Sequence, residues 1–115
     1  MKYDDGVVFI CELKNVAENG YKPVNKLVKI NKHWFGERTI GYNRQYLAKG
    51  VNEQVDMLIR IHHDRNVRIG MHAVLGNKDQ FLIDNVQHLY DEDNLRCTDL
   101  TLRRLEKNYE LAIED

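Results

Sequence analysis

Residues 55–61 read VDMLIRI, and this stretch decides the fold. Apolar side chains recur at every second position, at Val55, Met57, Ile59 and Ile61. Successive side chains of a β-strand point to opposite faces of a sheet, so the pattern predicts a strand with one apolar face. We expect Ile59 to be buried in a core and Arg60 to point the other way, toward solvent.

Turn-forming sequences divide the chain after this strand into further pieces of strand length. The turns are HDRN, GNKD and DEDN, at residues 63–66, 76–79 and 91–94. The pieces that follow them carry Val67, Ile69 and Met71, then FLID and VQHLY, then LRCTDLTLRRL. Short strands separated by regularly spaced turns indicate an antiparallel meander that closes into a sandwich or a small barrel.

The N-terminal half is less uniform. The alternating VVFICEL (7–13) predicts a first strand, and KNVAENGYKP (14–23) is rich in turn formers and predicts a loop. VNKLVKINKHWF (24–35) fits a strand or a helical stripe, and periodicity leaves both open. At the C-terminus, RRLEKNYELAIED (103–115) could form a short helix, with one face made of Leu102, Leu105, Tyr109, Ala112 and Ile113.

Charge is nearly balanced over the chain but unevenly placed. The 115 residues carry 17 basic and 18 acidic side chains, and 43% are hydrophobic, which is typical of one globular domain over residues 1–115. Residues 22–49 hold seven basic side chains against Glu37 alone, whereas residues 84–115 hold nine acidic against four basic. Two solvated faces would explain this asymmetry, and so would two complementary contact surfaces.

The two cysteines and the apolar runs indicate the compartment. Cys11 and Cys97 are too far apart for a CxxC motif, and we expect both to be buried, reduced and structural. MKYDDG lacks the apolar run of a secretory signal, and no apolar stretch approaches the ~20 residues that span a membrane. We therefore expect a soluble protein with no membrane partner, made in the cytoplasm.

Three histidines and an aspartate cluster in IRIHHDRNVRIGMH (59–72), which raises the question of a metal centre. On a strand, His62 and His63 would point to opposite faces, so regular geometry cannot bring them to one ion. His72 could approach one of them across a hairpin, giving two imidazoles plus Asp64. A catalytic zinc takes three preorganised ligands, so we expect turn residues that face solvent and no metal or other cofactor.

Motifs for other chemistry are lacking as well. The sequence has no GxSxG elbow, no GxxxxGK[ST] phosphate loop and no GxGxxG. The carboxylates of DED (91–93) stand in a turn, where they normally face water. We therefore expect a protein that is not an enzyme.

The order of segments resembles a known family. An apolar strand (VVFICEL) is followed by a loop, a tryptophan-containing segment (LVKINKHWF) and RQYLA (44–48). An alternating strand, FLID (81–84), an acidic turn and a last strand complete the series. In this order the chain resembles the head–tail adaptor (head-closure, or stopper) family of tailed bacteriophages, most convincingly over residues 41–105. GERTIGYN (36–43) departs from the family pattern.

The resemblance implies an all-β fold, a small antiparallel barrel of about six strands. It implies a long loop between the second and third strands, within residues 36–54, and a strand rather than a helix at residues 24–35. It also implies a structural virion protein of a phage or prophage, made in the bacterial host cytoplasm. Copies would form a homo-oligomeric ring beneath the portal, close the DNA-filled head and offer a docking surface to tail proteins.

The basic segment supplies the candidate contact residues. Its side chains would face a neighbouring subunit, the portal ring or the packaged DNA, for which positive charge alone is sufficient. We expect Trp34 and Phe35 in the barrel core. The candidates for assembly or for facing the channel are Lys26, Lys29, Lys32, Arg38, Tyr42, Arg44, Tyr46 and Lys49.

Two rival functions remain open. One is a β-barrel nucleic-acid-binding module that reads single strands through Tyr42, Tyr46 and nearby lysines. The other is a metal-dependent enzyme that uses His62, His63 and His72. Oligonucleotide affinity would identify the first, and metal analysis of the purified protein the second.

Overall fold

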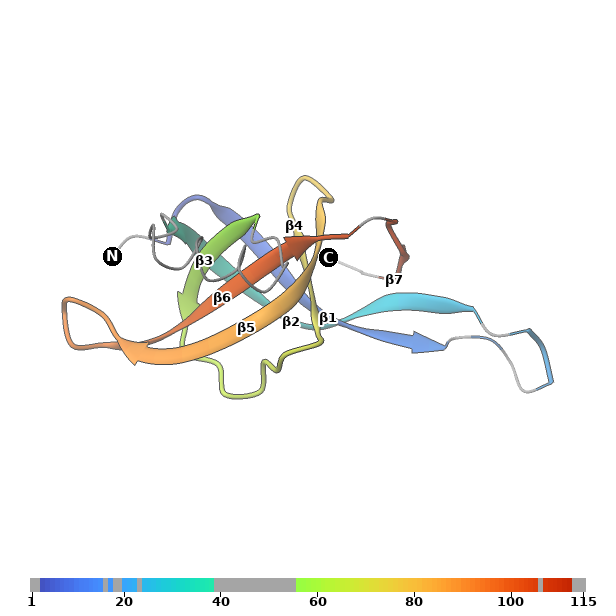
Figure 1. Ribbon diagram of the computed structural model, residues 1–115, viewed down its shortest axis with the longest axis horizontal. Helices are drawn as coiled ribbons and strands as arrows, with labels where there is room; N and C mark the ends of the chain where they lie inside the picture. Colours follow the sequence, from blue (N-terminus) through green and yellow to red (C-terminus); the bar gives the residue numbers. More distant parts are fainter. Residues whose placement is uncertain are drawn as a thin grey trace, which may run out of the picture.

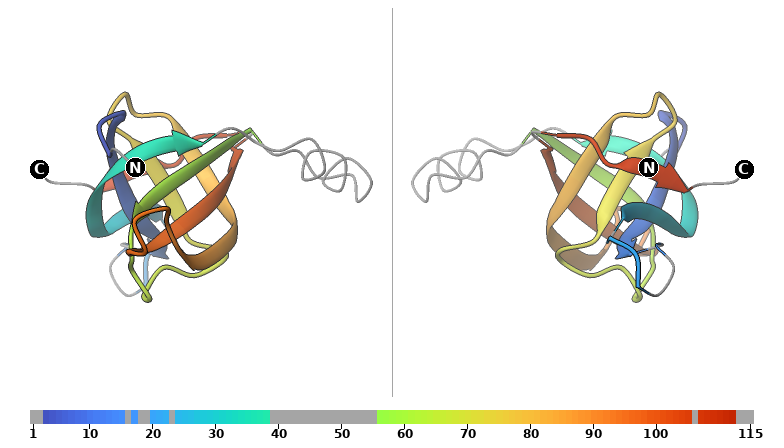
Figure 2. Two further views of the ribbon diagram at one scale, coloured as in Figure 1. Left: turned by 90° about the vertical axis from the view of Figure 1, so that its left-hand side faces the viewer. Right: turned by 90° about the vertical axis from the view of Figure 1, so that its right-hand side faces the viewer.

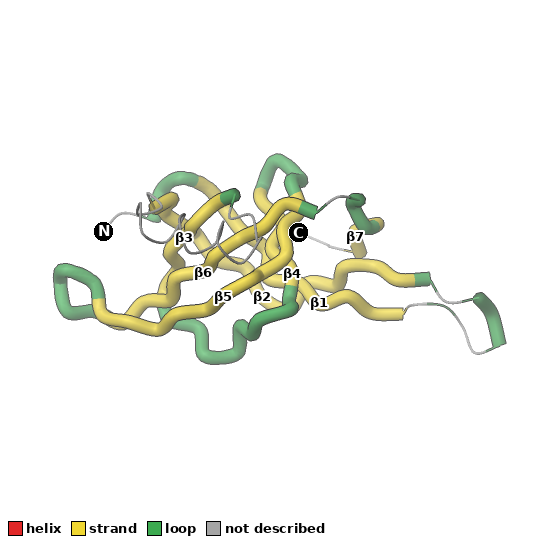
Figure 3. The backbone as a smooth tube through the Cα atoms, in the orientation of Figure 1, coloured by secondary structure: helices red, strands yellow, loops and turns green. Residues whose placement is uncertain are grey.

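The computed structural model describes residues 3–15, 17, 20–22, 24–38, 56–105 and 107–112. These residues form strands and loops, and none of them is helical (Figure 3). The strands are β1 (Gly6–Asn15), β2 (Asn25–Arg38), β3 (Met57–His62), β4 (His72–Leu75), β5 (Gln80–Tyr90), β6 (Arg96–Arg104) and β7 (Glu110–Ala112).

Six strands close into a ring in the order β1-β4-β5-β6-β3-β2, because β2 also pairs with β1. All pairs around the ring are antiparallel. Seen end on, the ribbons enclose one core (Figure 2). The small antiparallel barrel of about six strands is therefore confirmed. The chain passes from β2 to β3 through residues 39–55, so most of the expected loop lies outside the described residues, and its first three residues belong to β2.

The core fills the inside of this ring. Ile59 and Ile61 of β3 are fully buried there and face Leu100 and Thr98 of β6. The alternation in VDMLIRI thus defines the inner face, as predicted. The other buried apolar residues of this core are Val8, Ile10, Phe35, Val67, Met71, Ala73, Leu75, Phe81, Ile83, Leu100 and Leu102.

Two hairpins extend beyond the barrel in opposite directions (Figure 1). One is the outer part of β1 and β2, which stay paired as far as Asn15 and Asn25. The other is the β5–β6 hairpin, whose turn follows Tyr90. Residues 24–35, ambiguous between helix and strand in sequence, lie in β2, apart from Val24, which precedes it.

Residue Trp34 is not in the core. Its side chain is 59% exposed, whereas Phe35 is buried inside the barrel. Both residues are large and apolar, but adjacent residues of one strand point to opposite faces. Only one of the two could enter the core, so the prediction was right for Phe35 and wrong for Trp34.

The C-terminal helix is replaced by strand β7. Residues 110–112 pair in parallel with Lys26, Leu27 and Val28 of β2. The helical spacing was coincidental, because Leu102 belongs to β6 and points into the barrel. Pairing with β2 brings Leu111 against a second apolar cluster outside the barrel, formed by Phe9, Cys11, Leu27 and Val74. Burial of Leu111 against this cluster favours a strand here over the helix that the spacing of apolar residues predicts.

The side chain of Gln80 fixes the segment that leads to β7. Its amide nitrogen donates to the carbonyl of Tyr109 at 2.7 Å, and its amide oxygen accepts from the Tyr109 N–H at 2.8 Å. Gln80 is only 4% exposed. One buried glutamine therefore pairs with the backbone of Tyr109 as a neighbouring strand would, and holds the segment against β5.

Residue Arg60 also differs from expectation. It faces away from the core, as predicted, but it is 3% exposed rather than solvated. Its Nε and Nη2 donate to the two carboxylate oxygens of Asp99, the residue opposite it on β6, at 2.6 and 3.1 Å. Alternation indicates the face of a side chain but not what covers that face.

Candidate assembly surfaces

The three candidate lysines share strand β2 but do not share one environment. Lys26 forms an ion pair with Glu110 of β7, with Nζ and Oε1 3.1 Å apart. Lys29 and Lys32 instead place their Nζ atoms 5.9 and 5.7 Å from the ring centroid of Phe9. Their stems cover this ring while the charges stay at the surface. Lys26 is therefore tied to β7, and the other two form a basic lid over the outer apolar cluster.

The remaining candidates are only partly described. Arg38 is the last residue of β2 and is half-buried. Tyr42, Arg44, Tyr46 and Lys49 lie outside the described residues, so their predicted role stays a prediction.

The acidic turn occupies the tip of the β5–β6 hairpin. Oδ1 of Asp91 accepts hydrogen bonds from the N–H groups of Asp93 and Leu95, both at 2.9 Å. This geometry closes the turn and leaves Glu92 and Asp93 exposed. Tyr90 and Leu95, on either side of the turn, are 61% and 62% exposed. The tip combines negative charge with two unburied apolar side chains.

The other hairpin has a different tip. Tyr21 is 72% exposed and is followed directly by Lys22, which is also exposed. Leu13 and Val24 are partly uncovered nearby. Residues 14–26 carry three lysines against one glutamate. This tip therefore combines exposed apolar side chains with a net positive charge.

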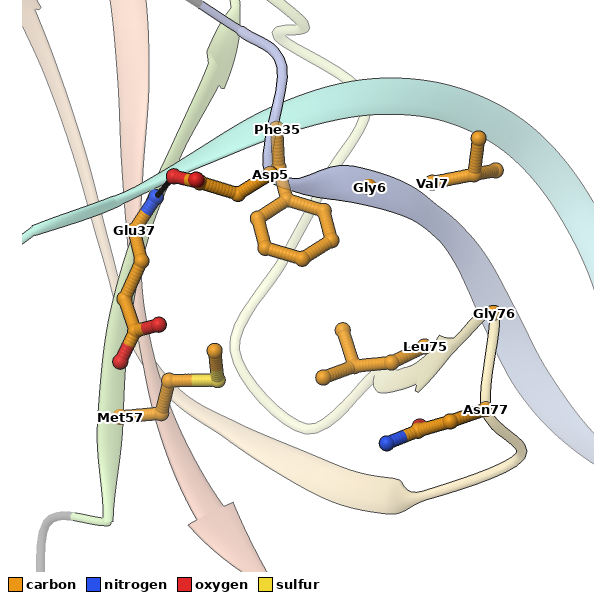
Figure 4. Close-up of a pocket in the computed structure, with 9 residues that line it drawn as sticks. All are labelled: Asp5, Gly6, Val7, Phe35, Glu37, Met57, Leu75, Gly76 and Asn77. Carbon is orange, nitrogen blue, oxygen red and sulfur yellow. Dashed lines mark hydrogen bonds between the residues drawn. The ribbon is translucent and has the colours of Figure 1, made fainter.

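A hollow of about 320 Å³ opens at the mouth of the barrel. Phe35, Met57 and Leu75 point into it, while Asp5 and Glu37 lie on one side (Figure 4). The strands that build it are the start of β1, the end of β2, the start of β3 and the end of β4. Gly6, Val7, Gly76 and Asn77 complete the wall.

Two hydrogen bonds of Asp5, one from its backbone and one to its side chain, shape one side of this hollow. The N–H of Asp5 donates to the carbonyl of Phe35 at 3.0 Å, and Oδ2 of Asp5 accepts from the N–H of Glu37 at 2.6 Å. Gly6 follows with a positive φ of 151°, and a Cβ there would lie 3.2 Å from the Phe35 ring. Glycine is thus required for the chain to enter β1 this close to Phe35.

The histidines of IRIHHDRNVRIGMH (59–72) do not gather at one point. His62 stacks on Tyr3, His63 meets His88 edge to face, and His72 meets Tyr109, with ring centroids 4.1, 4.9 and 5.7 Å apart. In the described part of the chain, no group of three or more His, Cys, Asp or Glu side chains could hold a metal ion.

His72 and Asp64 were expected to face solvent, but both are buried. Both carboxylate oxygens of Asp64 accept hydrogen bonds. Its Oδ2 lies 2.8 Å from Nε2 of His33 and accepts from the amide of Asn31 at 2.9 Å, and its Oδ1 caps Asn66. Although burial opposes ionisation, these hydrogen bonds hold the pKa of Asp64 below its ordinary value. The sequence Asp64-Arg65-Asn66 at a turn predicts the hydrogen bond from the N–H of Asn66 to Asp64. No neighbouring residue in the sequence indicates the contact with His33.

The thiols have environments that suppress reactivity. Burial raises the pKa of Cys11 to about 11, only partly opposed by Lys29. Burial also raises the pKa of Cys97. Both cysteines are free and buried. Since the thiolate is the reactive form, both side chains act as small apolar groups of the fold.

Comparisons with known proteins give a fold and no family. No family model and no curated protein match the chain. The structure is similar to the solution structure of protein SF1141 from Shigella flexneri 2a, with a TM-score of 0.56 and 14% identity. The match covers 89% of this chain and 94% of that one. Within the described segments, no helix has the length and apolar character needed to cross a membrane.

Proposed function

We propose that this protein is a structural assembly subunit of a tailed phage or prophage, which forms a ring beneath the portal and closes the DNA-filled head. The observation that carries the proposal is the pair of hairpins that extend from opposite sides of a closed barrel (Figure 1). A barrel without open edges around its ring does not associate by adding strands there. Its contacts with other copies and partners would then be made by the two projecting hairpins.

The projecting tips have the charges that a directional contact needs. The β5–β6 tip carries Asp91, Glu92 and Asp93, whereas the β1–β2 hairpin bears an excess of lysines. Contacts between two different patches of identical subunits are heterologous, and they close into a ring when the rotation allows. Complementary charge would steer and orient such contacts.

The resemblance in segment order supplies the biological setting. It implies portal, tail proteins and packaged DNA as partners, with assembly in the bacterial cytoplasm and residence in the virion. The similar Shigella structure supports the fold and is silent about these partners.

Reversal of Lys26, Lys29 and Lys32 to glutamate tests the proposal. We expect a folded monomer that no longer joins the portal, giving heads that lose DNA or fail to join tails. Exposed charges contribute only about 0–1 kcal/mol to monomer stability, while the same defect recurs at each subunit contact. The assay is electron microscopy of particles assembled with the portal and tail proteins of the phage.

A matched control separates charge from position. Arg65, Arg68 and Lys107 are exposed and lie outside β2. Their reversal to glutamate makes the same change in net charge and should leave assembly intact. Reversing Asp91, Glu92 and Asp93 to lysine should rescue the β2 variant if the two segments meet. Normal particles from the β2 variant would refute the role of the basic segment.

One observation favours a nucleic-acid-binding module as the alternative. Trp34 is exposed and lies two residues from Lys32, so both side chains project from the same face of β2. An aromatic ring beside a cation is the element on which single strands stack. Trp34 is the only tryptophan, so quenching of its fluorescence by a short oligonucleotide at moderate salt would support the module. A head-closure subunit should show little quenching before assembly.

A further inference from the structure

The hollow at the barrel mouth and the tip of the β1–β2 hairpin have complementary chemistry. We propose that the β1–β2 tip of one copy inserts Tyr21 into the hollow of a second copy, with Lys22 reaching the carboxylates at its side. This contact deepens the proposed ring and rests on that function, because it names the surfaces through which neighbouring subunits would join.

The interior of the hollow is apolar and suits an apolar side chain. Phe35, Met57 and Leu75 line its interior (Figure 4). A single aromatic side chain carries an apolar surface of ~150–250 Å² and a polar end when it is a tyrosine. A volume of about 320 Å³ accommodates one such side chain without rearrangement of the strands.

One side of the hollow is acidic and suits a positively charged group. One carboxylate oxygen of Asp5 accepts a hydrogen bond from the N–H of Glu37. Glu37 is exposed, and no group in the described part of the chain bonds its carboxylate. Among the described residues that line the hollow there is no basic side chain. An incoming ammonium group would therefore meet two carboxylates and no opposing cation in the wall.

The hairpin tip supplies both properties at once. Tyr21 is among the most exposed large apolar side chains, and Lys22 is its neighbour in the chain. Leu13 and Val24 of the same hairpin are also exposed, so the tip presents more than one apolar side chain to a partner. Its net positive surroundings favour an acidic binding surface, and the hollow combines such a surface with an apolar interior that can take the ring.

The fold makes the contact directional. Gly6 and Phe35, at the hollow, are partners near one end of the β1–β2 ladder, while Asn15 and Asn25, at the tip, are partners at the other. Ten residues of β1 separate the two ends by roughly 30 Å at ~3.3 Å per residue. The tip cannot fold back into its own hollow, so it must enter another copy. Repetition of one such contact generates a ring when the rotation between copies closes.

Cysteine cross-linking tests the contact directly. Val24→Cys, in the same hairpin as Tyr21, and Asn77→Cys are made in separate chains, mixed at high concentration and oxidised. Val24 is 43% exposed, and its replacement keeps Tyr21 itself. Both native cysteines are buried. We expect the mixed dimer to form in several-fold excess over either homodimer. The matched control pairs Asn77→Cys with Tyr90→Cys, an exposed tyrosine at the other hairpin tip. Equal yields from the two mixtures, or no cross-link in either, would overturn the proposal.

Charge reversal provides a second test without cysteines. Lys22→Glu and Glu37→Lys should each weaken self-association in sedimentation velocity, and a mixture of the two variants should recover it. Failure of the mixture to recover would contradict the contact. If copies cross-link but do not join a portal, the proposed function is refuted and the contact stands. If copies form portal-bound rings without this cross-link, the contact is refuted and the proposed function stands.

Discussion

The inner and outer faces of the barrel wall bury their residues for different reasons. On the inner face of β3, Ile59 is enclosed by side chains from the same ring of strands. On the outer face, Arg60 is almost equally buried, and its Nε and Nη2 donate to the carboxylate of Asp99. Inner burial follows from alternation within one strand. Outer burial depends on a partner elsewhere in the chain, and the two faces should therefore respond differently to substitution.

Replacing Arg60 with alanine should cause the largest loss on the outer face. Asp99 would be left buried without its partner, and breaking a buried ion pair in this way costs about 3–5 kcal/mol of unfolding free energy. Replacing both residues, as Arg60→Met with Asp99→Leu, should recover most of the loss. Chemical denaturation measures both variants, and a loss near zero for Arg60→Ala would show that the pair is solvated after all.

Replacing Ile59 with alanine tests the inner face. We expect a loss of about 2–5 kcal/mol, because a fully buried isoleucine leaves a cavity in a closed core. Ile69→Ala is the control, since Ile69 is 64% exposed and should change stability little. Similar losses at the two isoleucines, in the same denaturation assay, would be incompatible with the inner face described above.

Replacing Gln80 with alanine sharpens the comparison on the outer face. The change removes both hydrogen bonds to Tyr109 and leaves its backbone groups to find water, at about 1–3 kcal/mol. The effect should be local, so hydrogen exchange should accelerate in residues 107–112 while β3 and β6 stay protected. Gln87→Ala, on the exposed part of β5, should change neither.

The smallest effect is expected from His62 and His63, at the end of β3. Changing His62 and His63 together to alanine should alter the unfolding free energy by no more than about 0.5 kcal/mol, as for surface positions. Their ring contacts with Tyr3 and His88 are solvent-accessible. A larger loss in thermal denaturation, or stoichiometric zinc in the purified protein, would require a structural role that the geometry does not show.

The residues that were predictable are those whose burial is local in origin. Ile59 and Ile61 follow from alternation, and HDRN, GNKD and DEDN fall in or beside turns because turn chemistry acts within four residues. Strand β2 contained the right residues but an ambiguous period. Its bulge at Ile30, opposite Ile10 and Cys11 of β1, and the lysines over Phe9 break the alternation.

The residues that were not predictable depend on partners far away in the sequence. Arg60 needs Asp99, 39 positions later, and Asp64 needs His33, 31 positions earlier. Strand β7 exists because β2 offers an edge beside Leu27. The same limit applies to the candidate site. The charge asymmetry was visible in sequence, but the separation of Lys26 from Lys29 and Lys32, and the hollow beside Glu37, required the fold.

The continuity of β1 and β2 has a mechanical consequence. The same two strands form both the barrel wall and the projecting hairpin, with no hinge between them apart from the bulge at Ile10 and Cys11. In antiparallel pairs the hydrogen bonds run perpendicular to the strands. A pull on the hairpin tip therefore loads the β1–β4 and β2–β3 ladders in shear, so that their bonds share the force instead of opening one after another. The hairpin is anchored as a tension-bearing arm.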